Sequence, residues 1–162
     1  MISTLQRPNL IEPAGMQLAA KFILDICSKN NLVPNIYDLY SCFPVAIQMF
    51  AKSLNLNNIK DKTVTGAMPF AGGPLNSYVL HSTAKLIEKL RENNGIGIVT
   101  GVSGMMTKQS YALWSKNKEI DFIHKDVTKD AETIEKALEL SEFEDGEGKI
   151  VGYTVISKKD IN

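Results

Sequence analysis

The sequence from residue 63 to residue 114 constrains the fold of this chain most strongly. It contains a short apolar segment, a loop rich in glycine and proline, an amphipathic helix of about four turns, an apolar strand and a second glycine-containing loop. This order of elements is typical of half of a layered α/β domain. Because both loops are rich in glycine, their backbones could face the same ligand.

The composition bounds the size of the domain and the class of partner. With 162 residues, 44% of them hydrophobic, the chain suits one domain with an ordinary core, or one domain with a small appendage. Lysine plus arginine and aspartate plus glutamate both number 18, so the formal net charge is zero. This balance, without a basic block, argues against nucleic acid or an anionic membrane as the main partner.

The targeting signals and the number of cysteines bear on the cellular compartment. The sequence shows no signal peptide, and no apolar run approaches the roughly 18 residues of a membrane span. Its two cysteines, Cys27 and Cys42, are too few for a disulfide framework or a metal-ligand cluster, so no metal site is predicted. We therefore expect a reduced, cytoplasmic protein.

Hydrophobic periodicity predicts helices and strands in alternation. Apolar residues recur at helical spacing over residues 14–28, and a short strand is predicted at 36–40. Ser41 is a candidate N-cap for the next helix, and Pro44 suits its first turn. A further helix is predicted between the loop at 71–76 and the helix-ending residues 93–95. Two strands complete the main layer, one at 96–100 and a neighbouring one at 111–114.

The composition changes after Trp114. Residues 115–130 are rich in lysine and aspartate, 131–140 are predicted to form a short helix, and 142–149 an acidic turn. Apolar, β-branched and aromatic residues at 149–156 predict a strand. We therefore divide the chain into a main domain at residues 1–116 and a small appended domain at 117–162.

Three motifs in order carry a resemblance to a known family. They are DLYSCFP at 38–44, FAGGPLNSY at 70–78 and VTGVSGMMTK at 99–108. Together they resemble the C-terminal half of a thiolase, and more closely the type 1 thiolase-like proteins, which carry an additional small C-terminal domain. The match in order and spacing covers about residues 7–114, and the tail ending at 152–155 resembles the added domain.

The resemblance implies a fold and an active site. Thiolases pair two βαβαβαββ halves and place the active site where the halves meet. The expected fold is therefore α/β: the C-terminal half of a thiolase fold, with α/β/α layers and a mixed sheet, plus a small β-rich appended domain. Three loops of the second half carry an Asn-Glu-Ala-Phe (or His-Asp-Cys-Phe), a Gly-His-Pro and a Cys-x-Gly motif. Their positions here are Tyr40, Ser41, Cys42 and Phe43; Gly72, Gly73 and Pro74; and approximately Thr100, Gly101 and Val102.

The departures from the family pattern concern the chemical groups. Gly73 stands where the thiolase histidine would be, Thr100 stands near the acid/base cysteine, and Tyr40 replaces the residue that positions the catalytic water. A Claisen condensation needs a thiolate nucleophile and a base matched to the working pH. The nucleophile belongs to the first half of a thiolase, which this sequence does not contain. We therefore predict an acetyl-CoA acetyltransferase-like chain that is inactive by itself.

The same loops suggest a ligand and partners. Thiolase loops border the pantetheine and thioester end of coenzyme A, so coenzyme A or acyl-CoA is the expected ligand, and no other cofactor is required. The candidate contacts are Phe43, Gly72, Gly73, Pro74, Gly101 and Gly104. Alternatively, these glycines only permit tight turns. The expected protein partners are a second copy of the chain or a separate N-terminal thiolase-like chain, and the alternative function is a non-catalytic acyl-CoA-binding or assembly module.

A hydrolase is a third, less favoured hypothesis. It would use Ser41 or Cys42 with a histidine, but His81 and His124 have no clear route to either residue. A helix N-terminus could lower the pKa of the Cys42 thiol. Packing is the simpler role for Cys42, and a solvated surface position is the simpler one for each histidine.

Overall fold

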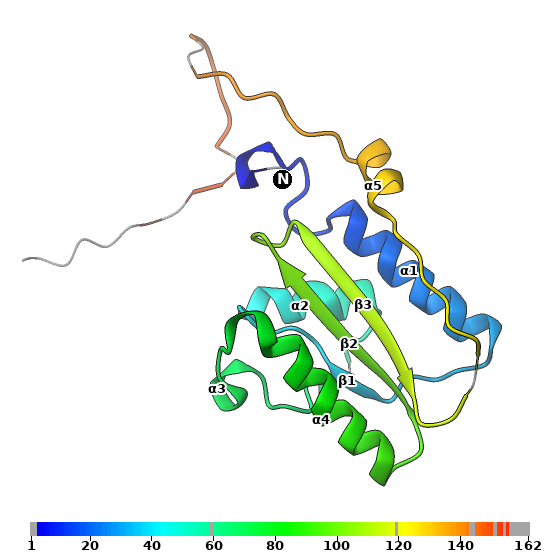
Figure 1. Cartoon of the computed structure of the whole chain (residues 1–162). Helices are drawn as coiled ribbons and strands as arrows, with labels where there is room; N and C mark the ends of the chain where they lie inside the picture. The colour runs from blue at the N-terminus through cyan, green and yellow to red at the C-terminus, as the bar shows by residue number, and fades with distance from the viewer. Residues whose placement is uncertain are drawn as a thin grey trace, which may run out of the picture.

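The computed structural model describes residues 3–58, 60–118, 120–142, 145–150, 152–153 and 155. Within these residues the chain is a mixed α/β structure (Figure 1). Its elements are two short 3₁₀ helices, Thr4–Gln6 and Leu75–Ser77; the helices α1 (Ala14–Lys29), α2 (Pro44–Ser53), α3 (Met68–Ala71), α4 (Tyr78–Glu92) and α5 (Thr128–Ile134); and the strands β1 (Ile36–Asp38), β2 (Ile96–Ser103) and β3 (Lys108–Ser115).

The three strands form one mixed sheet in the order β1-β2-β3. The short strand β1 pairs in parallel with β2, from Ile36 opposite Gly97 to Asp38 opposite Val99. β3 pairs antiparallel with β2 along its whole length. The expected mixed sheet is therefore confirmed, and β2 is its centre.

Helices cover both faces of the sheet. Because side chains alternate along a strand, Ile98 packs with α1 and α2 in the larger core cluster, whereas Val99 packs with Leu86 and Leu90 of α4. Figure 1 shows α1 and α4 on opposite sides of the sheet. The result is a helix–sheet–helix arrangement around β2.

Most of the predicted elements of the main layer are present, with shifted ends. The predicted helix at 14–28 is α1, and the strands predicted at 96–100 and 111–114 are longer, as β2 and β3. Pro44 does occupy the first turn of α2, but the N-cap is Phe43 and makes no side-chain cap bond. The prediction that Ser41 caps α2 is therefore wrong, because the Ser41 hydroxyl bonds elsewhere.

The chain after β3 differs more from prediction. The helix predicted at 131–140 lies earlier and is shorter, as α5. Among the residues of 149–156 that the structure describes (149, 150, 152, 153 and 155), none lies in a strand, so that prediction is wrong there; positions 151, 154 and 156 lie outside the described residues. No β-rich unit follows β3 in the described part of the chain.

The segment after β3 instead folds back along α1 (Figure 1). The Glu135 carboxylate accepts hydrogen bonds from the backbone N–H of Asn9 (3.3 Å) and of Ala14 (2.7 Å), at the start of α1. The Leu138 N–H donates to the Gln6 carbonyl at 2.8 Å. The boundary between residues 116 and 117 stays a prediction. No helix in the described ranges has the length and apolar character that crossing a membrane requires.

Candidate functional site

The first motif loop leaves the carboxyl end of β1. Because β1 and β2 are parallel, their carboxyl ends meet at the same edge of the sheet. The Tyr40 N–H there donates to the Thr100 hydroxyl at 2.9 Å. The structure therefore brings the first and third motifs into direct contact, 60 residues apart in sequence.

A series of hydroxyl groups, buried at Ser41 and Tyr78 and half-buried at Thr65, extends from this contact. The Ser41 Oγ lies 2.9 Å from the Tyr78 hydroxyl, which lies 3.3 Å from the Thr65 Oγ1. Both the hydroxyl and the backbone N–H of Thr65 donate to the Asp38 Oδ2, at 2.8 and 2.9 Å. This series of hydroxyl groups thus ends at the fully buried Asp38 carboxylate. Its Oδ1 has no hydrogen-bond partner among the described residues.

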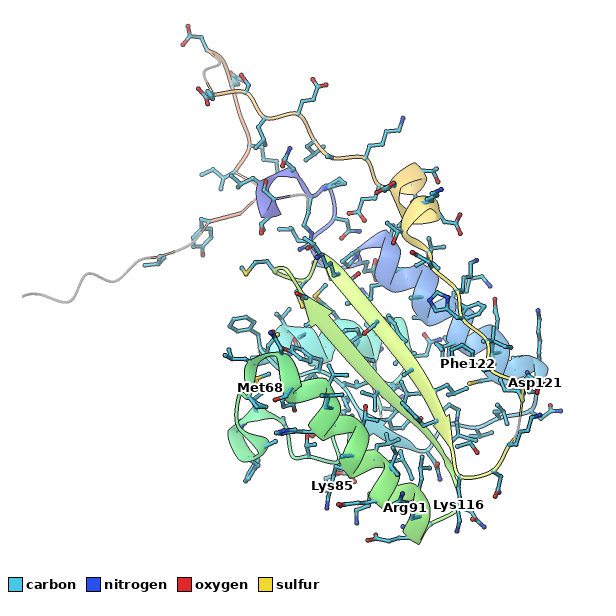
Figure 2. The ribbon with its side chains drawn as sticks, in the orientation of Figure 1. Met68, Lys85, Arg91, Lys116, Asp121 and Phe122 are labelled. Carbon is cyan, nitrogen blue, oxygen red and sulfur yellow. The ribbon has the colours of Figure 1, made fainter. Side chains whose placement is uncertain are left out.

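The second motif loop is attached to this hydroxyl chain through its neighbour Met68. The Met68 N–H donates to the Ser41 Oγ at 3.1 Å, and Figure 2 shows Met68 beside the start of α4. Gly72 and Gly73 themselves are exposed; a Cβ on Gly72 would meet no atom within 4 Å. The two glycines of this turn are therefore open to solvent, and the turn is tied to the first motif through Met68.

The glycines of the third motif have different surroundings. Gly101 is buried inside β2, and a Cβ there would lie 2.7 Å from the Ser110 Oγ and 3.1 Å from the Val79 Cγ2. The lack of a side chain at Gly101 therefore allows Ser110 and Val79 to pack closely against the β2 backbone. Gly104 lies in the turn between β2 and β3 at φ +59°, where the Thr107 N–H donates to its carbonyl.

The thiol and phenol groups of the first motif are not activated. Burial raises the pKa of the half-buried Cys42 thiol, and backbone hydrogen bonds, from Phe43 first, lower it by less. Burial, followed by the neighbouring Cys42 and Tyr78, also raises the pKa of the Tyr40 phenol. Both groups therefore stay protonated near neutral pH, and Cys42 lacks the thiolate character that a nucleophile needs.

The two histidines give no general base to this site. His81 is exposed on α4, and His124 is exposed in the segment that follows β3. Across the described ranges, neither forms a hydrogen bond with Ser41 or Cys42. The same ranges hold no group of three or more His, Cys, Asp and Glu side chains that could bind a metal ion.

No role for Asp38, Thr65 or Tyr78 was predicted from the sequence. The available signal was an aspartate, a threonine and a tyrosine beside apolar segments that were expected to be buried. A buried polar side chain needs a partner, but sequence spacing alone could not say which residues supply it.

Comparisons with protein-family models, with curated proteins and with solved structures returned no match to this chain.

Proposed function

We propose that this chain is the C-terminal part of an acetyl-CoA acetyltransferase-like protein of the thiolase superfamily, acting on acyl-CoA in the reduced cytoplasm. The Tyr40–Thr100 hydrogen bond carries the proposal, since it joins the first motif, just beyond the carboxyl end of β1, to the third motif within β2. Ligands of α/β sheets commonly bind at this edge. The exposed Gly72 and Gly73 backbone beside it suits close approach of a thioester or pantetheine group.

In this proposal the chain does not catalyse acyl transfer by itself. Gly73 has no side chain that could take a proton, and the buried Thr100 hydroxyl already accepts the Tyr40 N–H. Cys42 is a protonated thiol, and no basic side chain among the described residues hydrogen-bonds to it. Acyl transfer therefore needs a nucleophile and a base from another polypeptide.

An assay of acetoacetyl-CoA thiolysis, combined with a coenzyme A titration by native mass spectrometry, tests this proposal. We expect no thiolysis by the purified chain and a saturable 1:1 complex with coenzyme A. Turnover above background would overturn the claim of inactivity. A chain that binds no coenzyme A, alone or with an N-terminal thiolase-like chain, would overturn the assignment to acyl-CoA chemistry.

A non-catalytic assembly module is the second candidate. Phe70, Leu75 and Met105 are 86%, 87% and 73% exposed, and all three belong to the second or third motif. Large exposed apolar side chains such as Phe70 and Leu75, which belong to one motif, favour contact with another protein surface. Such a module would pair with a second copy or with a separate N-terminal half.

Sedimentation equilibrium distinguishes the two candidates. The assembly module predicts a dimer or a hetero-complex that Phe70→Ser and Leu75→Ser weaken, whether or not coenzyme A is present. A monomer at every concentration, alone and with the N-terminal chain, would count against the module. The matched control is Val33→Ser, which changes an exposed apolar residue outside the three motif loops.

A further inference from the structure

Two buried polar side chains each have an atom without a hydrogen-bond partner. Asp38 is 0% exposed and Ser82 is 1% exposed, yet the Asp38 Oδ1 and the Ser82 Oγ have no partner among the described residues. The great majority of buried polar atoms in proteins are hydrogen-bonded, and an exception often marks a bound water molecule or ion. Where these two atoms lie therefore decides whether they share a ligand.

The Asp38 side chain lies on the face of the sheet that α4 covers. Residues directly opposite each other in neighbouring strands share a face, and side chains alternate along each strand. Asp38 lies opposite Val99, which packs with Leu86 and Leu90 of α4. Ile36, two residues before Asp38, packs against the same cluster. Both neighbours therefore place the Asp38 carboxylate between β1 and α4.

Ser82 lies on the side of α4 that faces the sheet, and at the same level. A Cβ on Gly97 would lie 2.5 Å from a methyl carbon of Leu86, and a Cβ on Gly101 would lie 3.1 Å from the Val79 Cγ2. The helix therefore runs antiparallel to β2. Ser82 is buried between these two contacts, level with the middle of β2, which is where the pairing with β1 ends.

A second set of contacts joins the same two residues. Tyr78 precedes Ser82 by one turn of α4, and its hydroxyl lies 3.3 Å from the Thr65 Oγ1. Thr65 in turn donates two hydrogen bonds to the Asp38 Oδ2, so Oδ1 is the free oxygen of that carboxylate. Strand register and side-chain contacts thus both indicate that the Asp38 Oδ1 and the Ser82 Oγ share the space between β1 and α4.

The charge of the carboxylate indicates a cation as the ligand. Asp38 takes part in none of the ion pairs within the described ranges, and both hydrogen bonds to its side chain come from Thr65. A buried carboxylate is costly unless a positive charge or a metal ion balances it. A water molecule would supply hydrogen bonds but no charge. Carboxylate and hydroxyl oxygens are suitable ligands for hard cations.

The closed surroundings select the ion. Both atoms are sealed from solvent, so the space between them suits an ion smaller than a water molecule. A dehydrated Na⁺ meets this condition, whereas K⁺ is about as large as water. Mg²⁺ keeps several water molecules and Ca²⁺ takes about six to eight oxygen ligands, so neither suits this space. We propose that Asp38 and Ser82 bind one dehydrated Na⁺, which joins β1 to α4.

Unfolding in different chloride salts tests this proposal. Na⁺ is replaced stepwise by K⁺ or by choline at constant ionic strength, and urea unfolding is measured in each mixture. We expect Na⁺, at about ten times its dissociation constant, to raise the folding equilibrium constant about tenfold, because it binds only the folded chain. K⁺ and choline should have no such effect. Equal stability in Na⁺ and K⁺, as a bound water or a protonated Asp38 would give, would overturn the proposal.

Three variants show whether Na⁺ acts at this site. Ser82→Ala removes one ligand and Asp38→Asn removes the charge, so each should lose the advantage of Na⁺ over K⁺. Thr83→Val is the matched control, because it removes a hydroxyl of the same helix that bonds to the Val79 carbonyl, and it should keep the advantage. A Na⁺ effect that persists in both site variants would overturn the proposal. If Asp38→Asn does not fold, Ser82→Ala decides, since it removes only a hydroxyl without a partner in the described ranges.

Discussion

At the scale of single residues, hydroxyl groups hold the loops of the candidate site together. Tyr78 is central, because its hydroxyl lies within hydrogen-bonding distance of both Ser41 and Thr65, and its ring packs edge-on against Tyr40 with centroids 5.2 Å apart. A buried hydroxyl that loses its partner costs about 1–3 kcal/mol. These contacts therefore fix the loops more firmly than their glycine-rich sequences would.

Tyr78→Phe should lower the free energy of unfolding by about 1–2 kcal/mol. The ring contact stays, but Ser41 and Thr65 each lose a partner. Urea unfolding measures the change. Tyr40→Phe is the control, since the Tyr40 hydroxyl has no hydrogen bond within the described ranges and its loss should cost little. Equal losses in the two variants would show that the hydroxyl chain adds nothing.

Tyr111 should make the protein sensitive to alkali. Burial raises the pKa of Tyr111 above its usual range, and its hydrogen bond with Ser53 lowers the pKa by less. Above about pH 10 the unfolded state loses the phenol proton while the folded state keeps it. Stability contributed by the neutral phenol is thus complete below that pH and falls as the pH rises further.

Urea unfolding between neutral pH and strongly alkaline pH checks this expectation. Tyr111→Phe should reduce the steepness of the alkaline loss, even though it also removes the bonds to Ser53 and to the Met16 carbonyl. Tyr153→Phe, at an 89% exposed position, should leave the steepness unchanged. An alkaline profile that is identical in all three proteins would contradict the assignment to Tyr111.

At the scale of elements, close packing of α4 on β2 depends on a glycine. A Cβ on Gly97 would lie 2.5 Å from one methyl carbon of the fully buried Leu86. Gly101 allows a similar approach of Val79 from the first turn of the same helix. The glycine spacing that suggested a buried strand therefore also sets how closely α4 can approach the sheet.

Gly97→Ala should destabilise the fold by about 1–3 kcal/mol, because the added methyl group forces Leu86 or the whole helix away from the strand. Thermal or urea unfolding measures the loss. Gly73→Ala is the matched control, since the nearest atom to its Cβ would be the Met68 Sδ at 4.0 Å, and it should be nearly neutral. A neutral Gly97→Ala would mean that α4 tolerates a different distance from the sheet.

At the scale of the whole molecule, both core clusters lie within the first 116 residues. Their members range from Met16 to Leu113. The segment after β3 adds polar contacts instead, such as the Glu135 carboxylate on the N-terminus of α1. A carboxylate at a helix N-terminus contributes about 0.3–2 kcal/mol.

A chain truncated after Lys116 should therefore still unfold cooperatively, with a free energy of unfolding lower by about 1 kcal/mol. Circular dichroism during urea unfolding measures both properties. Glu135→Ala in the full chain should reproduce most of the loss, whereas Glu132→Ala on the same segment should not. A truncated chain without a cooperative transition would contradict the boundary between residues 116 and 117.

The sequence by itself determined most elements of the main layer. The spacing of apolar residues located α1 and α4, Pro44 marked the first turn of α2, and the glycine-spaced apolar run located β2. These signals are local, because the buried face of a helix or strand is indicated by apolar residues only a few positions apart in the sequence. The same local signals misplaced α5 and predicted a strand at 149–156, whose described residues lie in no strand and in neither core cluster.

Only the tertiary structure decided which polar groups meet. Asp38 and Thr65 are 27 residues apart, and Ala14 and Glu135 are 121 apart, so no periodic pattern relates them. The Ser41 hydroxyl bonds with Tyr78 and Met68 and does not cap α2, because the tertiary fold brings those two partners to it from α4 and α3. Sequence pattern encodes which side chains are buried, whereas partners across the fold are set by how the layers pack.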